Sequence, residues 1–138
     1  MKTIHVLLSL ILVLSVTTNA QTFEWAKSFG GNNYVKSNSI STDALGNVYT
    51  TGYFEGTVDF DPGAGSEILS TQGSDDIFVQ KLDNSGNLLW VKSFGGNSAD
   101  QSSSITVTPS GSIYITGCFR ETVDFDPGIG TEYFTAQG

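Results

Sequence analysis

Two pairs of aspartates are the side chains of this chain that are best placed for chemistry. Asp59 and Asp61 lie in a Val-Asp-Phe-Asp-Pro-Gly segment, and Asp124 and Asp126 lie in an identical segment further along. Side chains alternate along an extended strand, so each pair of carboxylates projects from one face. Together with backbone carbonyls, such a pair could hold Ca²⁺. The spacing is not that of an EF-hand, and the alternative is a short strand that ends in a Pro-Gly turn with its acids in solvent.

The same pairs could also be the acid and nucleophile of a glycosidase. That chemistry needs two carboxyl groups roughly 5 to 9.5 Å apart, one of them with a raised pKa. Here, however, the motif occurs twice, whereas an active site normally occurs once. The repetition therefore favours a structural role, and we expect no catalytic residue and no enzyme activity.

Composition excludes several further kinds of site. The single histidine is His5 and the single cysteine is Cys118. A Ser–His–Asp triad or a His-ligated metal cannot form after position 5, and no intrachain disulfide is possible. With 14 acidic residues against 6 basic ones, the net charge is −8, and the basic residues do not cluster. We therefore expect no nucleic-acid partner.

The first 20 residues have the features of a secretory signal. Lys2 precedes an apolar run from Val6 to Val16, and Thr18 and Ala20 supply the small residues that signal peptidase requires. The run is too short to cross a bilayer as a helix. We expect cleavage before Gln21, a secreted or cell-surface location, and no membrane span after cleavage.

The rest of the chain is an internal repeat. Trp25–Asn32 recurs as Trp90–Asn97, and Thr57–Gly63 recurs unchanged as Thr122–Gly128, both at an offset of 65 residues. At this offset the two units align without a gap, with 26 identities in 51 positions. A repeat of this regularity is typical of proteins built from stacked structural units.

Each unit contains hairpin signals. The turns Asp43–Gly46, Asp83–Gly86 and Thr108–Gly111 begin with a side-chain oxygen that can cap a turn and end in a glycine suited to a left-handed conformation. The first two turns each lie between two segments of alternating polarity in the first unit, which are Ser39–Thr42 and Asn47–Phe54, and Asp76–Leu82 and Asn87–Phe94. Helical periodicity is absent, so the predicted fold class is all-β, with four-stranded antiparallel blades.

Two segments carry a resemblance to a known family. Asp75–Gly96 (DDIFVQKLDNSGNLLWVKSFGG) resembles the bacterial SBBP β-propeller repeat, and so does Gly46–Gly52 with its counterpart Gly111–Gly117. The resemblance covers residues 23–138. It implies a partial β-propeller of just under two blades in a secreted protein of the kind made by Bacteroidetes-like bacteria. The family shares no catalytic residues, so the resemblance implies no activity.

The repeat also sets the expected boundaries. After the signal peptide 1–20, the propeller region 21–138 comprises a closing-type strand 23–31, a first full blade 39–96 and an incomplete second blade 104–138. Because a propeller usually has four to eight blades, we expect an N-terminal fragment of a longer protein. Unpaired strand edges would invite self-association.

Other conspicuous side chains have structural explanations. We expect Trp25 and Trp90 to pack between blades, the alternative being a sugar-stacking platform. Asp75 and Asp76 are expected to cap a loop or face solvent. The residues expected in the core are Tyr49, Phe54, Tyr114, Cys118 and Phe119.

The predicted function is that of an exported, non-enzymatic repeat module, a scaffold or a binding surface for a protein or glycan ligand, with no cofactor. One alternative is an adhesin-type module stabilised by Ca²⁺ at Asp59, Asp61, Asp124 and Asp126. The other is a fragment of a larger secreted enzyme whose active site lies outside this chain.

Overall fold

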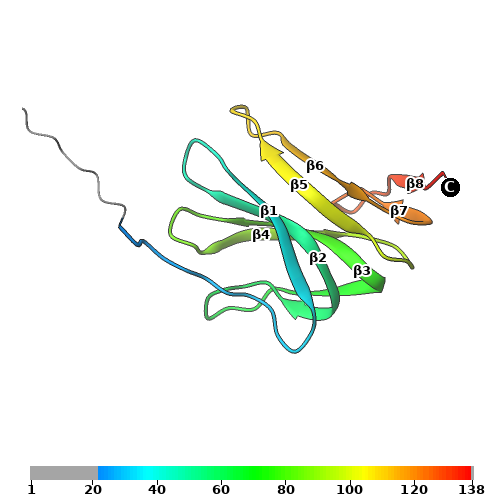
Figure 1. Cartoon of the computed structure of the whole chain (residues 1–138), viewed down its shortest axis with the longest axis horizontal. Helices are drawn as coiled ribbons and strands as arrows, with labels where there is room; N and C mark the ends of the chain where they lie inside the picture. The colour runs from blue at the N-terminus through cyan, green and yellow to red at the C-terminus, as the bar shows by residue number, and fades with distance from the viewer. Residues whose placement is uncertain (1–21, 138) are drawn as a thin grey trace, which may run out of the picture.

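The computed structural model describes residues 22–137, so the expected signal peptide 1–20 lies outside the described residues. The described chain consists of strands and loops (Figure 1). No helix in this part of the chain is long and apolar enough to cross a membrane. The strands are β1 (Val35–Thr42), β2 (Val48–Asp59), β3 (Ile68–Leu82), β4 (Leu88–Phe94), β5 (Gln101–Val107), β6 (Ile113–Cys118), β7 (Thr122–Asp124) and β8 (Tyr133–Thr135).

The first unit forms one four-stranded antiparallel sheet in the order β1-β2-β3-β4. Its turns form as their residues predict: the backbone N–H of Gly46 donates to Asp43 O, and that of Gly86 to Asp83 O, each over 3.0 Å. Both glycines have positive φ, 78° and 80°, a conformation that costs other residues energy. The sheet is an all-β blade, as the sequence predicts.

The two central strands are longer than predicted. Beyond a bulge at Gly56, β2 and β3 separate and pair again, so that Val58 faces Leu69 and Asp59 faces Ile68. The Val-Asp-Phe-Asp-Pro-Gly segment is therefore the far end of one long hairpin. Its loop, residues 60–67, therefore lies at the opposite end of β2 from the Asp43–Gly46 turn.

The second unit follows the same plan, but its strands form two separate sheets. β5 pairs with β6, and β7 pairs with β8, as separate two-stranded sheets. Residues 122–124 correspond to the far end of β2 and 133–135 to the start of β3, at the 65-residue offset. Within the described chain, no strand lies along the outer edge of β6.

The two units pack together through an apolar cluster. Tyr49, Val79 and Ile105 are buried there, and Trp90 packs against them, with its ring 6.1 Å from that of Tyr49. Trp90 thus lies between the units, as predicted. A buried hydrogen bond also joins the two units, in which Ser102 Oγ donates to Gly52 O over 2.9 Å.

A second apolar cluster lies within the first blade. Its buried members are Phe54, Val58, Phe60, Phe78 and Val91, and the half-buried ring of Phe29 packs against them. The expected burial of Tyr49 and Phe54 is confirmed, at 3% and 0% exposed.

The structure corrects the expected place of one tryptophan, whereas the closing-type strand 23–31 stays a prediction. Within 23–31, Gly30 makes an isolated bridge to Asp59, and residues 22–29 pair with no strand of the described part of the chain. Trp25 lies against the Gly86 turn of the first unit rather than between the units.

Several burial expectations are corrected as well. Tyr114 is 61% exposed, Cys118 is exposed and Phe119 is only half-buried, since the second unit has no strand beyond β6 among the described residues. Asp76, in contrast, is buried within β3 and does not face solvent.

Candidate functional site

The predicted metal ligands belong to the two outer loops. Asp59 ends β2, and its Oδ1 accepts the backbone N–H of Asp61 over 3.0 Å and of Glu67 over 2.9 Å. These donors, Glu67 first, hold the pKa of Asp59 below its ordinary value. The carboxylate therefore closes the loop by joining its two ends.

Asp61 organises the middle of the same loop. Its Oδ1 accepts the N–H of Gly63 over 2.7 Å. A Cβ atom at Gly65 would collide with Asp61 Oδ2, so a larger residue there would require this carboxylate to shift. Both acids of the pair thus contribute to the loop's own structure.

The second loop repeats this geometry. Asp124 Oδ1 accepts the N–H groups of Asp126 and Glu132 over 3.0 and 2.8 Å, and Asp126 Oδ1 accepts that of Gly128 over 2.6 Å. The two pairs lie in separate loops. Among residues 22–137, no three acidic, histidine or cysteine side chains are grouped so that they could hold a metal ion.

A small polar cavity of about 310 Å³ adjoins the first loop. It is lined by Asp59 and Asp61 together with the segment Ser28, Phe29, Gly30 and Gly31. This is where the structure brings a second segment of the chain close to the predicted calcium ligands.

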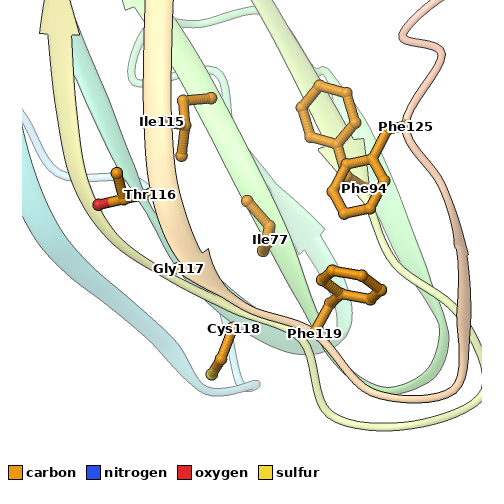
Figure 2. A pocket seen from close by; sticks show the side chains of 8 residues that line it. All are labelled: Ile77, Phe94, Ile115, Thr116, Gly117, Cys118, Phe119 and Phe125. Atoms are coloured by element: carbon orange, nitrogen blue, oxygen red, sulfur yellow. The ribbon is translucent and has the colours of Figure 1, made fainter. Parts of the chain in front are cut away.

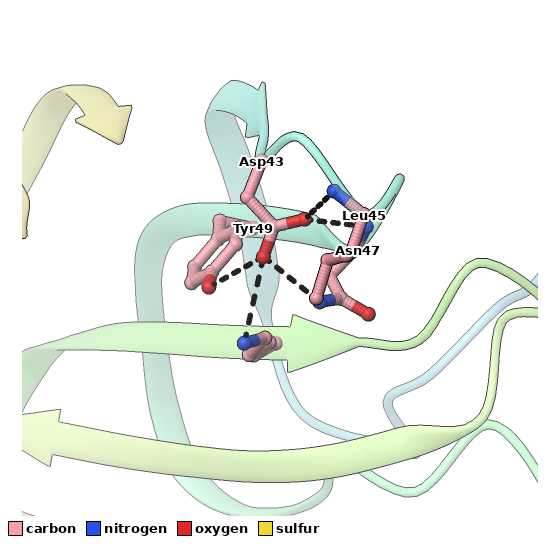
Figure 3. A network of polar contacts seen from close by, with 5 residues as sticks. Asp43, Leu45, Asn47 and Tyr49 are labelled. Atoms are coloured by element: carbon pink, nitrogen blue, oxygen red, sulfur yellow. Dashed lines mark hydrogen bonds and ion pairs between the residues drawn. The ribbon is translucent and has the colours of Figure 1, made fainter. Parts of the chain in front are cut away.

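The other predicted turn acids have structural roles. Asp43 accepts hydrogen bonds from Asn47 Nδ2 (2.8 Å) and Tyr49 Oη (3.1 Å), and Lys81 Nζ lies 3.6 Å away (Figure 3). The hydrogen bond from Asn47, the largest effect, lowers the pKa of Asp43 to about 2. Asp83 holds Asn87 in the same way. The network stabilises turns.

Sequence reasoning missed a buried acid pair. Asp76 and Asp100 are 1% and 0% exposed. Asp100 accepts the N–H groups of Gly96 and Arg120, each over 2.9 Å. It therefore links the loop between β4 and β5 to the loop between β6 and β7. Asp76 accepts the N–H of Gln72 over 3.1 Å through Oδ2, while its Oδ1 has no partner. Burial raises the pKa of Asp76 to about 6, with Asp100 adding to the effect.

An apolar groove lies beside the open edge of β6. Two adjoining pockets of about 560 and 570 Å³ share Phe94, Ile115 and Phe125 as lining residues. In Figure 2 the rings of Phe94, Phe119 and Phe125 gather on one side of β6. Sequence reasoning did not find this groove, because it predicted a core position for Phe119.

Both tryptophans are half-buried and take part in contacts within the protein. Trp25 is half-buried, and its Nε1 donates to Asn84 O over 3.0 Å. Trp90 lies in the cluster between the units. Both therefore serve packing.

The fold defines a repeat protein built from propeller-type blades, each an antiparallel meander with a loop held by a pair of aspartates. Comparison with known proteins agrees. Residues 24–53 match the model of the SBBP beta-propeller repeat family, so this stretch is similar to an SBBP repeat.

One curated protein supports the same class. An uncharacterized WD repeat-containing protein of Acanthamoeba polyphaga mimivirus is 25% identical in an alignment of 112 residues that covers 71% of this chain. The chain spans 8% of that protein's length. No solved structure matches the chain significantly. The comparisons thus define a propeller-type repeat protein, a class of structural and binding modules.

Proposed function

We propose that this chain is an exported, non-enzymatic β-propeller repeat module that binds a protein ligand, with scaffolding as its broader role. The observation that carries the proposal is the apolar groove beside β6, which is lined by Phe94, Ile115 and Phe125 (Figure 2). A contiguous exposed apolar surface of this kind marks an interaction site on a soluble protein. Among the described residues, exposed large apolar side chains occur in both units, and those of the second unit are Tyr114, Ile129, Tyr133 and Phe134.

The acids support a non-enzymatic role. The repeated carboxylates of Asp59 and Asp124 each accept two backbone N–H groups and close their loops. The buried pair, Asp76 and Asp100, is enclosed away from solvent, so a substrate would not reach it. The first set is engaged in hydrogen bonds of its own loops, and the second set is enclosed, which supports structural roles for both.

A protein ligand is favoured over a glycan. Sugar-binding surfaces present flat aromatic faces, and here Trp25 and Trp90 are engaged in the protein's own packing. The groove beside β6 is instead lined by apolar side chains such as Phe94, Ile115 and Phe125, which suit the apolar side chains of a protein ligand.

Export is supported by residues 1–20, which combine a basic start, an apolar run and Thr18-x-Ala20. The proposed location is therefore outside the cell or on its surface. The net charge of −8 suits solubility and opposes binding to polyanions.

The first test follows processing of the full chain, produced with its own N-terminus in a Gram-negative host. We expect the exported fraction to have the mass of residues 21–138. The control variant Leu12→Arg, which interrupts the apolar run, should stay inside with its N-terminus intact. A wild-type chain that keeps residues 1–20 in the cytoplasm would contradict export.

The second test measures binding of the full chain to arrays of immobilised peptides and glycans. We expect binding to extended peptides that is lost in Ile115→Glu, which puts a charge in the groove, and kept in Thr106→Glu, an exposed position on β5. Binding to glycans alone, or peptide binding that Ile115→Glu leaves unchanged, would refute the proposed protein-binding groove.

A further inference from the structure

The connection between the two units lies against two neighbouring acids of β3. This connection, residues 95–100, leads from β4 to β5. At its end, the N–H of Asp100 donates to Asp75 O over 2.8 Å. At its start, a Cβ atom at Gly95 would collide with the carboxylate of Asp76, so the backbone lies directly against this group. The connection is therefore held on β3 at Asp75 and Asp76.

The carboxyl groups of Asp76 and Asp100 differ in the number of N–H groups that they accept. Both side chains are buried, at 1% and 0% exposed. Asp100 accepts one N–H with each oxygen, from Gly96 and from Arg120. Asp76 accepts one N–H with Oδ2, and its Oδ1 has no partner among residues 22–137. A buried carboxylate with few donors is costly in its charged form, so Asp76 is the member of the pair that favours a proton.

The internal repeat shows that the acid at position 100 is a departure from the first unit. At the 65-residue offset, Asp100 corresponds to Val35 and Arg120 to Glu55. In the first unit, the N–H of Glu55 donates to the backbone carbonyl of Tyr34 over 2.9 Å. In the second unit, the equivalent N–H donates to the carboxylate of Asp100. The second unit thus holds the same loop with a side chain that carries a charge.

The charged groups close to Asp76 are acidic. Asp75 adjoins it in β3, Asp100 acts on it from the connection, and from β2 the exposed Glu55 faces Asp75. A further titratable group, the phenol of Tyr34, lies close to Asp75. Among the described residues, no basic side chain forms an ion pair with Asp76 or Asp100. The basic side chains of neighbouring elements are exposed: Lys36 on β1, Lys92 on β4 and Arg120 after β6.

Burial makes Asp76 a weaker acid in the folded chain than in water. It raises the pKa of Asp76 to about 6 from an ordinary 3.8, and the charges of Asp100 and Asp75 add to the effect. When the connection opens, Asp76 returns to water and its pKa falls toward the ordinary value. The closed state therefore binds the proton more tightly, and its advantage is lost as the pH rises from 3.8 through 6.

We propose that Asp76 and Asp100 form a pH-sensitive switch, which holds residues 95–100 on β3 while Asp76 is protonated and lets them detach locally once Asp76 is ionised. In the closed state the carboxyl group of Asp76 is neutral, and the charge of Asp100 is stabilised by its two N–H donors. Ionisation adds a second negative charge at a buried site with a single donor. Detachment exposes both carboxylates to water.

The switch acts on the contact between the two units and does not depend on the proposed binding function. Because the N–H of Arg120 donates to Asp100, detachment also frees the loop between β6 and β7. The four-stranded sheet of the first unit keeps its own ladders, since these pair β1, β2, β3 and β4 with one another. The expected change is therefore a local opening rather than unfolding of the chain.

Hydrogen exchange of the full chain, followed at each residue by NMR, tests the switch. The amides to follow are those of Gly96, Asp100 and Arg120, whose hydrogen bonds hold the connection. Their protection, corrected for the intrinsic exchange rate, should fall about 10-fold between roughly pH 5 and pH 7.5. A local opening exposes little surface, so low urea should leave their exchange unchanged, while it accelerates exchange in the central strands β2 and β3.

Two variants and one wild-type measurement assign the response. Asp76→Asn cannot ionise and should remove the pH dependence at the three amides. Glu55→Gln, the matched control on the neighbouring strand, should keep it. In the wild-type chain, the carboxyl carbon of Asp76 should titrate near pH 6 by NMR, and this measurement stands even where Asp76→Asn fails to fold.

Four outcomes would overturn the switch. Protection of the three amides that does not change with pH, or a pH dependence that Asp76→Asn retains, would remove Asp76 from the response. Titration of the Asp76 carboxyl at its ordinary value of 3.8 would do the same. Exchange of the three amides that accelerates in low urea together with that of β2 and β3 would assign the pH response to unfolding of the whole chain.

Discussion

Gln80 Nε2 donates to the backbone carbonyl of Phe60 over 2.6 Å, and both residues are fully buried. This bond joins the central strand β3 to the loop that follows β2. Gln80 Oε1 has no partner among the described residues. The loop with the aspartate pair is thus anchored from inside the blade as well as by its own carboxylates.

Replacing Gln80 tests this anchor. Gln80→Leu should lower the free energy of unfolding by about 1 to 3 kcal/mol, because the buried carbonyl of Phe60 loses its donor. Gln80→Glu should cost more, since it removes the donor and also places an acid in the interior. Urea denaturation measures both, with the exposed Lys92→Gln as control. Equal stability of Gln80→Leu and the wild-type chain would show that the bond contributes nothing.

Asp59 allows a test of the loop-closing carboxylate. Asp59→Ala should lower the urea concentration at the unfolding midpoint, because two backbone N–H groups lose their acceptor. Asp59→Asn should restore most of this loss, since an amide oxygen can accept the same hydrogen bonds. Equilibrium unfolding in urea compares the two, with the exposed Glu55→Gln as control. An Asn variant as unstable as the Ala variant would argue against the acceptor role.

Calcium dependence separates the two interpretations of the aspartate pairs. We expect the melting temperature of the full chain to stay within about 1 °C when calcium or EDTA is added, because Oδ1 of each aspartate already accepts backbone N–H groups. Differential scanning fluorimetry gives the answer. A rise of several degrees with calcium, lost in Asp61→Asn, would instead establish a metal site at the cavity beside Gly30.

The buried Asp76 predicts an unusual pH dependence. Its pKa is about 6 in the folded chain against 3.8 ordinarily, so the folded state binds the proton more tightly. This group's contribution to stability is complete below pH 3.8 and is lost as the pH rises through 6. The free energy of unfolding should fall by about 2 kcal/mol between roughly pH 4 and pH 7.

The matched variant is Asp76→Asn, which cannot titrate and should flatten the profile between roughly pH 4 and pH 7. Urea unfolding across this range measures the slope. Asp43 does not interfere, because its pKa of about 2 makes its contribution fall away only below its ordinary value of 3.8. An unchanged slope in Asp76→Asn would assign the pH dependence to other groups.

Local structure followed from the residues alone. The repeat predicted two similar units, and the residues at Asp43, Gly46, Asp83 and Gly86 predicted hairpins that the structure contains. These predictions succeed because turn geometry depends on neighbouring residues: a side-chain oxygen that accepts nearby N–H groups and a glycine that tolerates positive φ.

Burial, in contrast, depended on the packing of distant segments. Asp76 has the local sequence of a polar residue before a strand, yet neighbouring segments bury it, and Asp100 is buried likewise. Tyr114 has the same local sequence setting as the buried Tyr49, yet it is exposed, because burial requires neighbouring strands and packing surfaces from elsewhere in the chain. The groove beside β6 has the same origin: its walls are repeated in the sequence, but their accessibility depends on which strands lie alongside.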